Sequence, residues 1–223
     1  MSFFVPIKEL SDWRKFLGDP EKHWKTGRSA KSCAETWWNA SGFPEAIKTV
    51  FTSSEIDLFR DLEFIMGFPE YQVQLPPTSG HPSQNDLWVI AKSPKNNQLV
   101  SISIEAKVDE PFDQKVGEWI KEETTGKKER LRYICDLLDL DESETHNIRY
   151  QLMHRTVSAL IMADKLGTRN ALMMVQSFDA KRSGYEDYQE FSKLLGAEPN
   201  INKIVKTKPL SGKNLYLAWV EHR

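Results

Sequence analysis

Two acidic residues and a lysine lie close together in two apolar segments with alternating patterns. Glu105 and Lys107 lie two positions apart in SISIEAKV, and Asp86 begins the preceding segment, DLWVIAK. If residues 93–98 form the turn of a β-hairpin, every antiparallel pair has residue numbers that sum to 191. Asp86 would then lie opposite Glu105, and Lys107 would share their face of the sheet because residues two apart on a strand point the same way.

Two carboxylates this close repel each other unless a cation lies between them, so the arrangement indicates a metal site. Mg²⁺ commonly uses one or two carboxylate ligands, which leaves positions for water and a phosphate oxygen. We therefore expect Asp86 and Glu105 to bind Mg²⁺ or Mn²⁺, and Lys107 to orient the attacking water or stabilise charge on the phosphate. The alternative is a surface hairpin with a Lys–Glu ion pair, since the Glu-x-Lys pattern is short.

Hydrophobic periodicity divides the rest of the chain into short helices followed by alternating strands and helices. The expected helices cover residues 12–17, 29–39, 44–51, 55–66, 148–166 and 185–195, with a helical insertion at 113–140. The expected strands cover residues 71–75, the two arms of the hairpin, 171–178 and 215–220. The continuous apolar run at 171–178 is typical of an interior strand that is buried on both faces.

The bulk properties are those of a globular protein. The 223 residues carry a net charge of −2, which gives no global electrostatic argument for nucleic-acid binding. No apolar run approaches the roughly 18 residues of a membrane span, and the N-terminus lacks the pattern of a signal peptide, so we expect a cytoplasmic protein. Cys33 and Cys135 have no CxxC spacing and are expected to be buried free thiols.

The order helix, strand, strand, strand, helix, strand, combined with Asp86 and Glu105-Ala106-Lys107, resembles the restriction-endonuclease-like fold of the PD-(D/E)XK nuclease superfamily. The resemblance covers approximately residues 29–178, and it implies that the two acids bind Mg²⁺ and that the lysine helps to activate water. Asn85 replaces the proline of the motif, and the helical insertion separates the motif strand from the next helix. The whole chain also resembles a group of uncharacterised bacterial proteins.

The resemblance further implies a third acid on the first core helix. Glu35 is the candidate there, and Glu45, Glu55 and Glu63 compete with it for this role. An ordinary surface glutamate explains Glu35 equally well.

The helix expected at 148–166 carries polar residues beside its apolar stripe. Gln151 and Arg155 lie one turn apart and could contact phosphate, although an exposed polar flank is the equally good alternative. His154 is expected to serve packing or to lie at the surface.

We therefore expect a single α/β domain, residues 1–223, with a central mixed sheet flanked by helices and a helical N-terminal extension. The expected function is that of a Mg²⁺-dependent nuclease-like phosphodiester hydrolase acting on nucleic acid, with DNA slightly favoured over RNA. The alternative is a non-catalytic binding module on the same fold. The geometric prediction is that the carboxylates of Asp86 and Glu105 converge on a cleft bordered by the helix at 148–166.

Overall fold

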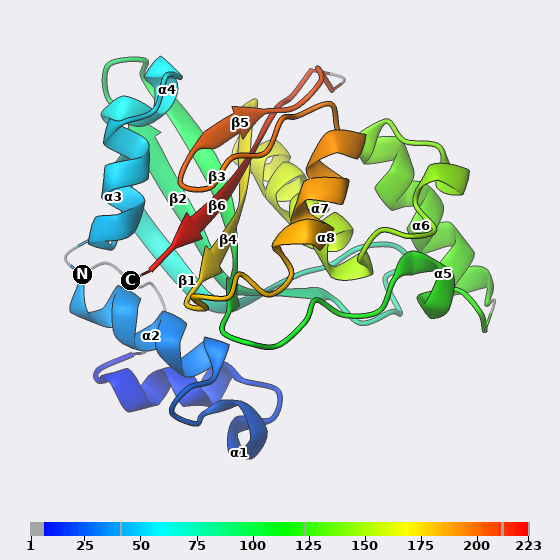
Figure 1. The fold of residues 1–223 in the computed structure, drawn as a ribbon, viewed down its shortest axis with the longest axis horizontal. Helices are drawn as coiled ribbons and strands as arrows, with labels where there is room; N and C mark the ends of the chain where they lie inside the picture. Colours follow the sequence, from blue (N-terminus) through cyan, green and yellow to red (C-terminus); the bar gives the residue numbers. More distant parts are fainter. Residues whose placement is uncertain (1–6, 41, 123, 211, 223) are drawn as a thin grey trace.

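The computed structural model describes residues 7–40, 42–122, 124–210 and 212–222, which form a six-stranded mixed sheet with helices on both faces (Figure 1). The order across the sheet is β1-β2-β3-β4-β6-β5. The strands are β1 (Glu63–Val73), β2 (Ser83–Ser93), β3 (Gln98–Lys107), β4 (Asn170–Ser177), β5 (Ile204–Lys206) and β6 (Asn214–Glu221). Strands β1, β2 and β3 are antiparallel, β3, β4 and β6 are parallel, and β5 is antiparallel to β6.

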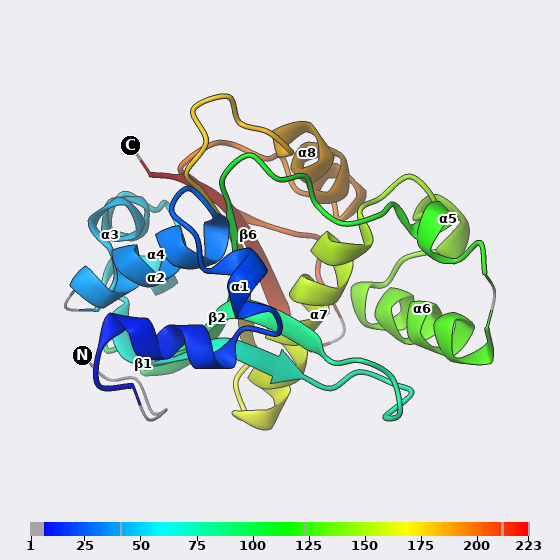
Figure 2. The ribbon, with the colours of Figure 1, turned by 90° about the horizontal axis from the view of Figure 1, so that it is seen from below.

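Two groups of helices cover the two faces of this sheet. The first group is η1 (Leu10–Phe16), α1 (Pro20–His23), α2 (Ser29–Asn39), α3 (Glu45–Thr52) and α4 (Asp57–Arg60). The second is α5 (Val116–Trp119), α6 (Thr125–Leu138), η2 (Glu142–Glu144), α7 (Tyr150–Lys165) and α8 (Tyr185–Leu194). Each group packs its own hydrophobic cluster against the sheet, and η1, α1 and α2 lie together at one end of it (Figures 1 and 2).

The distribution of apolar residues along the chain explains how the central elements are buried. Strand β4 is buried along its whole length, as expected for an apolar strand between two parallel neighbours. Helix α7 lies across β3 and β4 with an almost continuous buried face.

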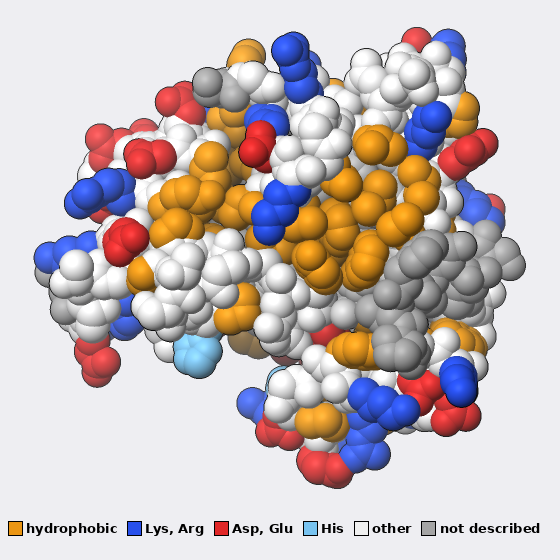
Figure 3. Space-filling view, turned by 180° about the vertical axis from the view of Figure 1, so that it is seen from behind, with side chains coloured by type: hydrophobic (Ala, Val, Ile, Leu, Met, Phe, Trp, Pro, Cys, Tyr) orange, Lys and Arg blue, Asp and Glu red, His pale blue; other side chains and the backbone are white. Residues whose placement is uncertain are grey.

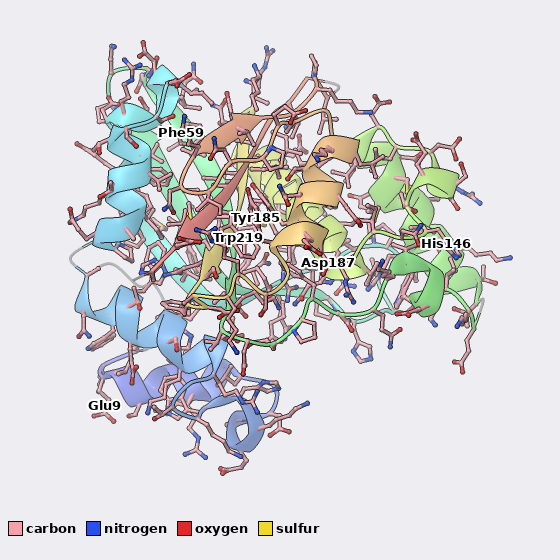
Figure 4. The ribbon with its side chains drawn as sticks, in the orientation of Figure 1. Glu9, Phe59, His146, Tyr185, Asp187 and Trp219 are labelled. Atoms are coloured by element: carbon pink, nitrogen blue, oxygen red, sulfur yellow. The ribbon has the colours of Figure 1, made fainter. Side chains whose placement is uncertain are left out.

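Specific side-chain contacts hold α8 in place. The Tyr185 ring of α8 packs against the Trp219 ring of β6 at a centroid distance of 5.1 Å, and Asp187 accepts a 2.9 Å hydrogen bond from Arg149 Nε (Figure 4). These contacts fix α8 against β6 and the start of α7.

The predicted register of the hairpin is confirmed. Strands β2 and β3 pair continuously from Ser93↔Gln98 to Leu87↔Ile104, and every pair sums to 191. The helix predicted at 29–39 coincides with α2, and the long helix and interior strand lie within two residues of their predicted bounds.

The helix predicted at 55–66 is wrong. Helix α4 covers only Asp57–Arg60, and β1 begins at Glu63, eight residues before the predicted strand at 71–75. The apolar residues of EFIMGF are compatible with the periodicity of a helix or of a strand. Pairing with β2 stabilises the strand. The patterns also gave no expectation for α1 or for the three-residue strand β5.

Strand β1 forms one edge of the sheet, and several of its apolar side chains are only half-buried. Ile65, Met66, Phe68 and Tyr71 border the hydrophobic cluster on the α7 side. Apolar side chains gather across the middle of the back of the molecule, the side on which β1 lies (Figure 3).

The cysteines and the helix lengths were also predicted from the sequence. Cys33 and Cys135 are buried free thiols, as predicted. Within the described ranges, no helix has the length and apolar character needed to cross a membrane.

Candidate active site

Strands β1 and β2 are both irregular at one level, where Glu70 and Asp86 lie. The β1–β2 pairing is interrupted at these two residues. Ser83 lies on the α7 side of the sheet, with its hydroxyl 2.8 Å from His154 Nδ1, whereas Leu87 packs among the side chains of the α2 side. In a regular strand, residues four positions apart point to the same face of the sheet. Ser83 and Leu87 point to opposite faces, so the alternation of side chains between the two faces shifts by one residue around Asp86.

This slip changes the expected relation of the two predicted carboxylates. The β2–β3 ladder ends at Leu87↔Ile104, so Asp86 does not continue it as a regular pair opposite Glu105. Instead, Asp86 Oδ2 accepts a 2.6 Å hydrogen bond from the backbone N–H of Ala106. Asp86 and Glu105 nevertheless line one pocket of about 470 Å³.

Glu105 is held by three side chains of β3 and α7. Its Oε2 accepts a 2.6 Å hydrogen bond from Arg155 Nε, and its Oε1 accepts 2.8 Å bonds from Gln151 Nε2 and Lys107 Nζ. The Lys107 ammonium also donates to Gln151 Oε1 at 3.0 Å and lies 4.8 Å from the centre of the Phe112 ring. The Glu105 side chain is only 3 % exposed, so this buried carboxylate carries two cationic partners.

Glu70 is a third acid that the sequence patterns missed. It lies in β1 with φ of 50°, an uncommon conformation for a residue other than glycine. Its Oε2 accepts a 2.9 Å hydrogen bond from Gln84 Nε2, whereas its buried Oε1 has no hydrogen-bond partner among the described residues. The Pro-Glu pair within the strand sequence GFPEYQV was the available signal, because proline in a strand is typical of edges and bulges.

The electrostatics of the three carboxyl groups differ. Burial, together with the charge of Glu105, raises the pKa of Asp86 to about 7. Burial and the charge of Asp86 raise the pKa of Glu70 well above its usual range. Burial also acts to raise the pKa of Glu105, but the charges of Lys107 and Arg155 outweigh it and leave that pKa lowered. At neutral pH, Glu105 is therefore ionised. Glu70 and Asp86 hold their protons more readily than free carboxyl groups do, because ionisation of either one raises the pKa of the other.

The structure brings Gln151 and Arg155 to the pocket but leaves Glu35 outside it. The Glu35 carboxylate is 46 % exposed on α2 and lies 3.6 Å from Lys31 Nζ. Glu45, Glu55 and Glu63 are exposed and do not line the pocket either. The pocket therefore places Glu70 of β1, and not an acid of the first core helix, beside Asp86 and Glu105.

The N-terminal segment forms one wall of this pocket. Gly18 and Asp19, which follow η1, and Ser29 and Ala30 at the start of α2 line the same pocket as the carboxylates of the sheet. The helical N-terminal extension thus contributes to the lining of the site, and Figure 2 shows α1 and α2 close together at this end of the sheet.

The donors present suit a hard cation. Asp86 and Glu70 offer carboxylate oxygens, and the buried Oε1 of Glu70, which has no hydrogen-bond partner among the described residues, is an oxygen that a bound cation would satisfy. Glu105 is less available because Arg155 and Lys107 already neutralise it. The described residues contain no group of three or more His, Cys, Asp or Glu side chains already arranged to hold a metal ion.

The comparisons with known proteins identify a family and nothing further. No curated protein and no solved structure matches the chain. A family model described as a domain of unknown function, DUF6946, matches residues 6–223, so the chain belongs to that family.

Proposed function

We propose that this member of the DUF6946 family is a Mg²⁺- or Mn²⁺-dependent phosphodiester hydrolase that acts on nucleic acid and has a restriction-endonuclease-like core. The observation that carries the proposal is the meeting of Asp86, Glu105 and Lys107 in one pocket, with Glu70 as an additional acid. The order α2, β1, β2, β3, α7, β4 supports the fold assignment, with α3 and α4 inserted before β1 and with α5, α6 and η2 inserted before α7.

Each side chain has a defined role in this proposal. Asp86 and Glu70 would hold the cation, and Glu105 would share it through the lone pairs that its hydrogen bonds leave unused. When bound, the cation would neutralise charge on the phosphate and acidify a water molecule. Lys107 Nζ, fixed by Glu105 and Gln151, would donate a hydrogen bond to the attacking water or to a phosphate oxygen.

The protonation state of Asp86 should make cation binding depend on pH. With a pKa of about 7, its carboxyl holds a proton in mildly acidic solution and releases it near neutrality. Cation binding requires the ionised carboxylates, and burial raises the pKa of Glu70 as well, so affinity for Mn²⁺ should rise as the pH rises through neutrality. Arg155 acts through Glu105, whose orientation and ionised state it maintains.

A non-catalytic binding module on the same fold is the second candidate. The observation that favours it is the state of Glu105, whose two oxygens already bind Lys107, Gln151 and Arg155. Such a protein would use these ion pairs to stabilise the junction of β3 and α7, and it would have no need of a divalent cation.

One experiment separates the two candidates. Purified protein is incubated with labelled single-stranded and duplex DNA and RNA in Mn²⁺, Mg²⁺ or EDTA, and Mn²⁺ binding is measured by calorimetry. We expect metal-dependent cleavage that is lost in Asp86→Asn and Glu105→Gln but kept in Glu129→Gln, which changes an exposed carboxylate of α6. Absence of both cleavage and Mn²⁺ binding in the wild-type protein would favour the binding module.

A further inference from the structure

A second pocket, of about 430 Å³, lies beside the candidate active site. It is enclosed by the β1–β2 loop, helices α5 and α6, and the start of α7. Tyr150 and His154 line this pocket, and the next residue after each of them, Gln151 and Arg155, lines the catalytic one. The two pockets therefore meet at the first turns of α7. We call the second one the ring pocket.

Aromatic and apolar groups form much of the wall of the ring pocket. The rings of Trp119 and Tyr150 stack in parallel, with centroids 4.0 Å apart and an interplanar angle of 11°. The His154 ring lies 4.8 Å from that of Tyr150, and Leu75 and Pro77 complete this part of the lining. Flat apolar walls of this kind suit a planar ring, and sites of this volume hold small ligands.

The charge of the ring pocket is positive. Lys127 and Arg130 line it, and its described lining residues include no aspartate or glutamate. The Lys127 ammonium lies 5.6 Å from the centre of the Trp119 ring. The catalytic pocket, in contrast, is rich in carboxylates. The ring pocket therefore suits a planar ring attached to an anion.

His154 adds a directional hydrogen-bond donor. Its Nδ1 lies 2.8 Å from Ser83 Oγ and 3.3 Å from Arg155 Nη1. Because a guanidinium group only donates, Nδ1 must accept, and the proton of the neutral ring is then on Nε2. Burial and the charge of Arg155 lower the pKa of His154 well below its usual range, so the ring stays neutral at physiological pH. Nε2–H can therefore donate to a carbonyl or ring nitrogen of a ligand.

Close packing between the loop and α6 fixes the shape of the pocket. The Arg130 guanidinium donates to the backbone carbonyls of Leu75, Pro76 and His81 in the β1–β2 loop. A Cβ at Gly80 would lie 2.5 Å from Arg130 Nη2, so glycine permits this approach. The loop and the helix thus form one wall, which needs no ligand to assemble it.

We propose that the ring pocket binds an unpaired base of the strand whose phosphodiester bond lies at the catalytic pocket, so that the substrate is single-stranded nucleic acid or an unpaired end. This inference rests on the proposed function. Arg155 connects the two sites, because its Nη1 contacts Ser83 and His154 and its Nε binds Glu105. A base in a duplex would first have to leave its stack, which disfavours duplex substrates. Stacking tolerates every base, so little sequence preference is expected.

The test is binding without turnover, measured by fluorescence anisotropy in EDTA with a labelled single-stranded oligonucleotide and its duplex. Thr124 lines the ring pocket and caps α6 by accepting a hydrogen bond from Lys127 N–H. Thr124→Asp keeps a capping oxygen but adds a negative charge to the pocket, and Glu129→Gln, at an exposed position of α6 outside both pockets, is the control. We expect the wild-type protein to prefer the single strand, Thr124→Asp and Trp119→Leu to weaken that binding about 10-fold or more, and Glu129→Gln to leave it unchanged.

The outcomes for the ring pocket and for the proposed function are distinct. Cleavage by the wild-type protein with no single-strand preference, or with both Thr124→Asp and Trp119→Leu binding normally, would overturn the ring pocket and leave the hydrolase intact. Single-strand binding that depends on these residues without any cleavage would support the pocket and contradict the hydrolase. Absence of binding to every nucleic acid, or binding of free nucleoside monophosphates but not of oligonucleotides, would overturn the inference. Circular dichroism and melting temperatures confirm that each variant is folded.

Discussion

Replacing Asp86 by asparagine should stabilise the protein in a pH-dependent manner. The pKa of this carboxyl rises from an ordinary 3.8 to about 7 on folding. At about 1.4 kcal/mol for each pH unit, this difference corresponds to about 4 kcal/mol. Because Asp86 is only half-buried and shares its titration with Glu70 and Glu105, we reduce this to about 2 kcal/mol. Asparagine keeps an oxygen that can accept the N–H of Ala106.

The sign follows from proton binding. Below pH 3.8 the carboxyl is protonated in both the folded and unfolded states, so it does not affect the free energy of unfolding. Between pH 3.8 and about 7 the folded protein retains a proton that the unfolded chain has lost, so stability falls as the pH rises. The destabilisation is complete about one pH unit above the folded-state pKa. Asp86→Asn should therefore match the wild type near pH 4 and exceed it by about 2 kcal/mol at pH 8.

The assay is thermal unfolding in EDTA between pH 4 and pH 8. For a chain of this length, the expected gain corresponds to a rise in melting temperature of roughly 6 °C at pH 8. Glu129→Gln, on the exposed side of α6, should show no pH-dependent difference. Added Mn²⁺ should stabilise the wild type but not Asp86→Asn. A variant that is less stable than the wild type by the same amount at every pH would refute the reasoning and identify Asp86 as a structural residue.

Three other perturbations test the remaining parts of the site. Arg155→Met should lower the free energy of unfolding at pH 7 by about 3 kcal/mol, because it removes a cation from buried Glu105; urea titration measures this, and a loss below about 0.5 kcal/mol would contradict it. Lys107→Met should keep Mn²⁺ affinity but reduce turnover about 100-fold on any substrate found, and wild-type turnover would exclude Lys107 from the mechanism. Burial raises the pKa of Cys33 well above its usual range and that of Cys135 to about 12, so neither thiol should react with a thiol reagent at pH 8 until denaturant is added; rapid labelling of the folded protein would contradict their burial.

The sequence predicted those features that depend on regular periodicity. Alternation along the hairpin fixed the register of β2 and β3, and the apolar run at 171–178 identified the interior strand. The same register led to Asp86, Glu105 and Lys107, which share a pocket. The metal and the reaction assigned to these residues remain predictions.

Features that depend on irregular backbone were not predictable in this way. The slip at Asp86 follows from matched distortions in two strands, and no periodic pattern in one strand encodes them. Glu70 was missed for the same reason, and also because the helix predicted at 55–66 overlaps the start of β1 and the predicted strand began only at residue 71. The wall formed by Gly18 and Ser29 depends on how the N-terminal segment folds over the end of the sheet, which is a tertiary property.

The irregularity in β1 also affects the tendency of the protein to aggregate. Strands β1 and β5 are the two edges of the sheet, and an open edge can pair with a strand of another molecule and start aggregation. Pro69 lacks an N–H group, and the left-handed backbone of Glu70 interrupts the extended conformation that a foreign strand would need. The opposite edge, β5, has only three residues. The distortion that brings an acid into the candidate active site therefore also protects the long apolar edge from self-association.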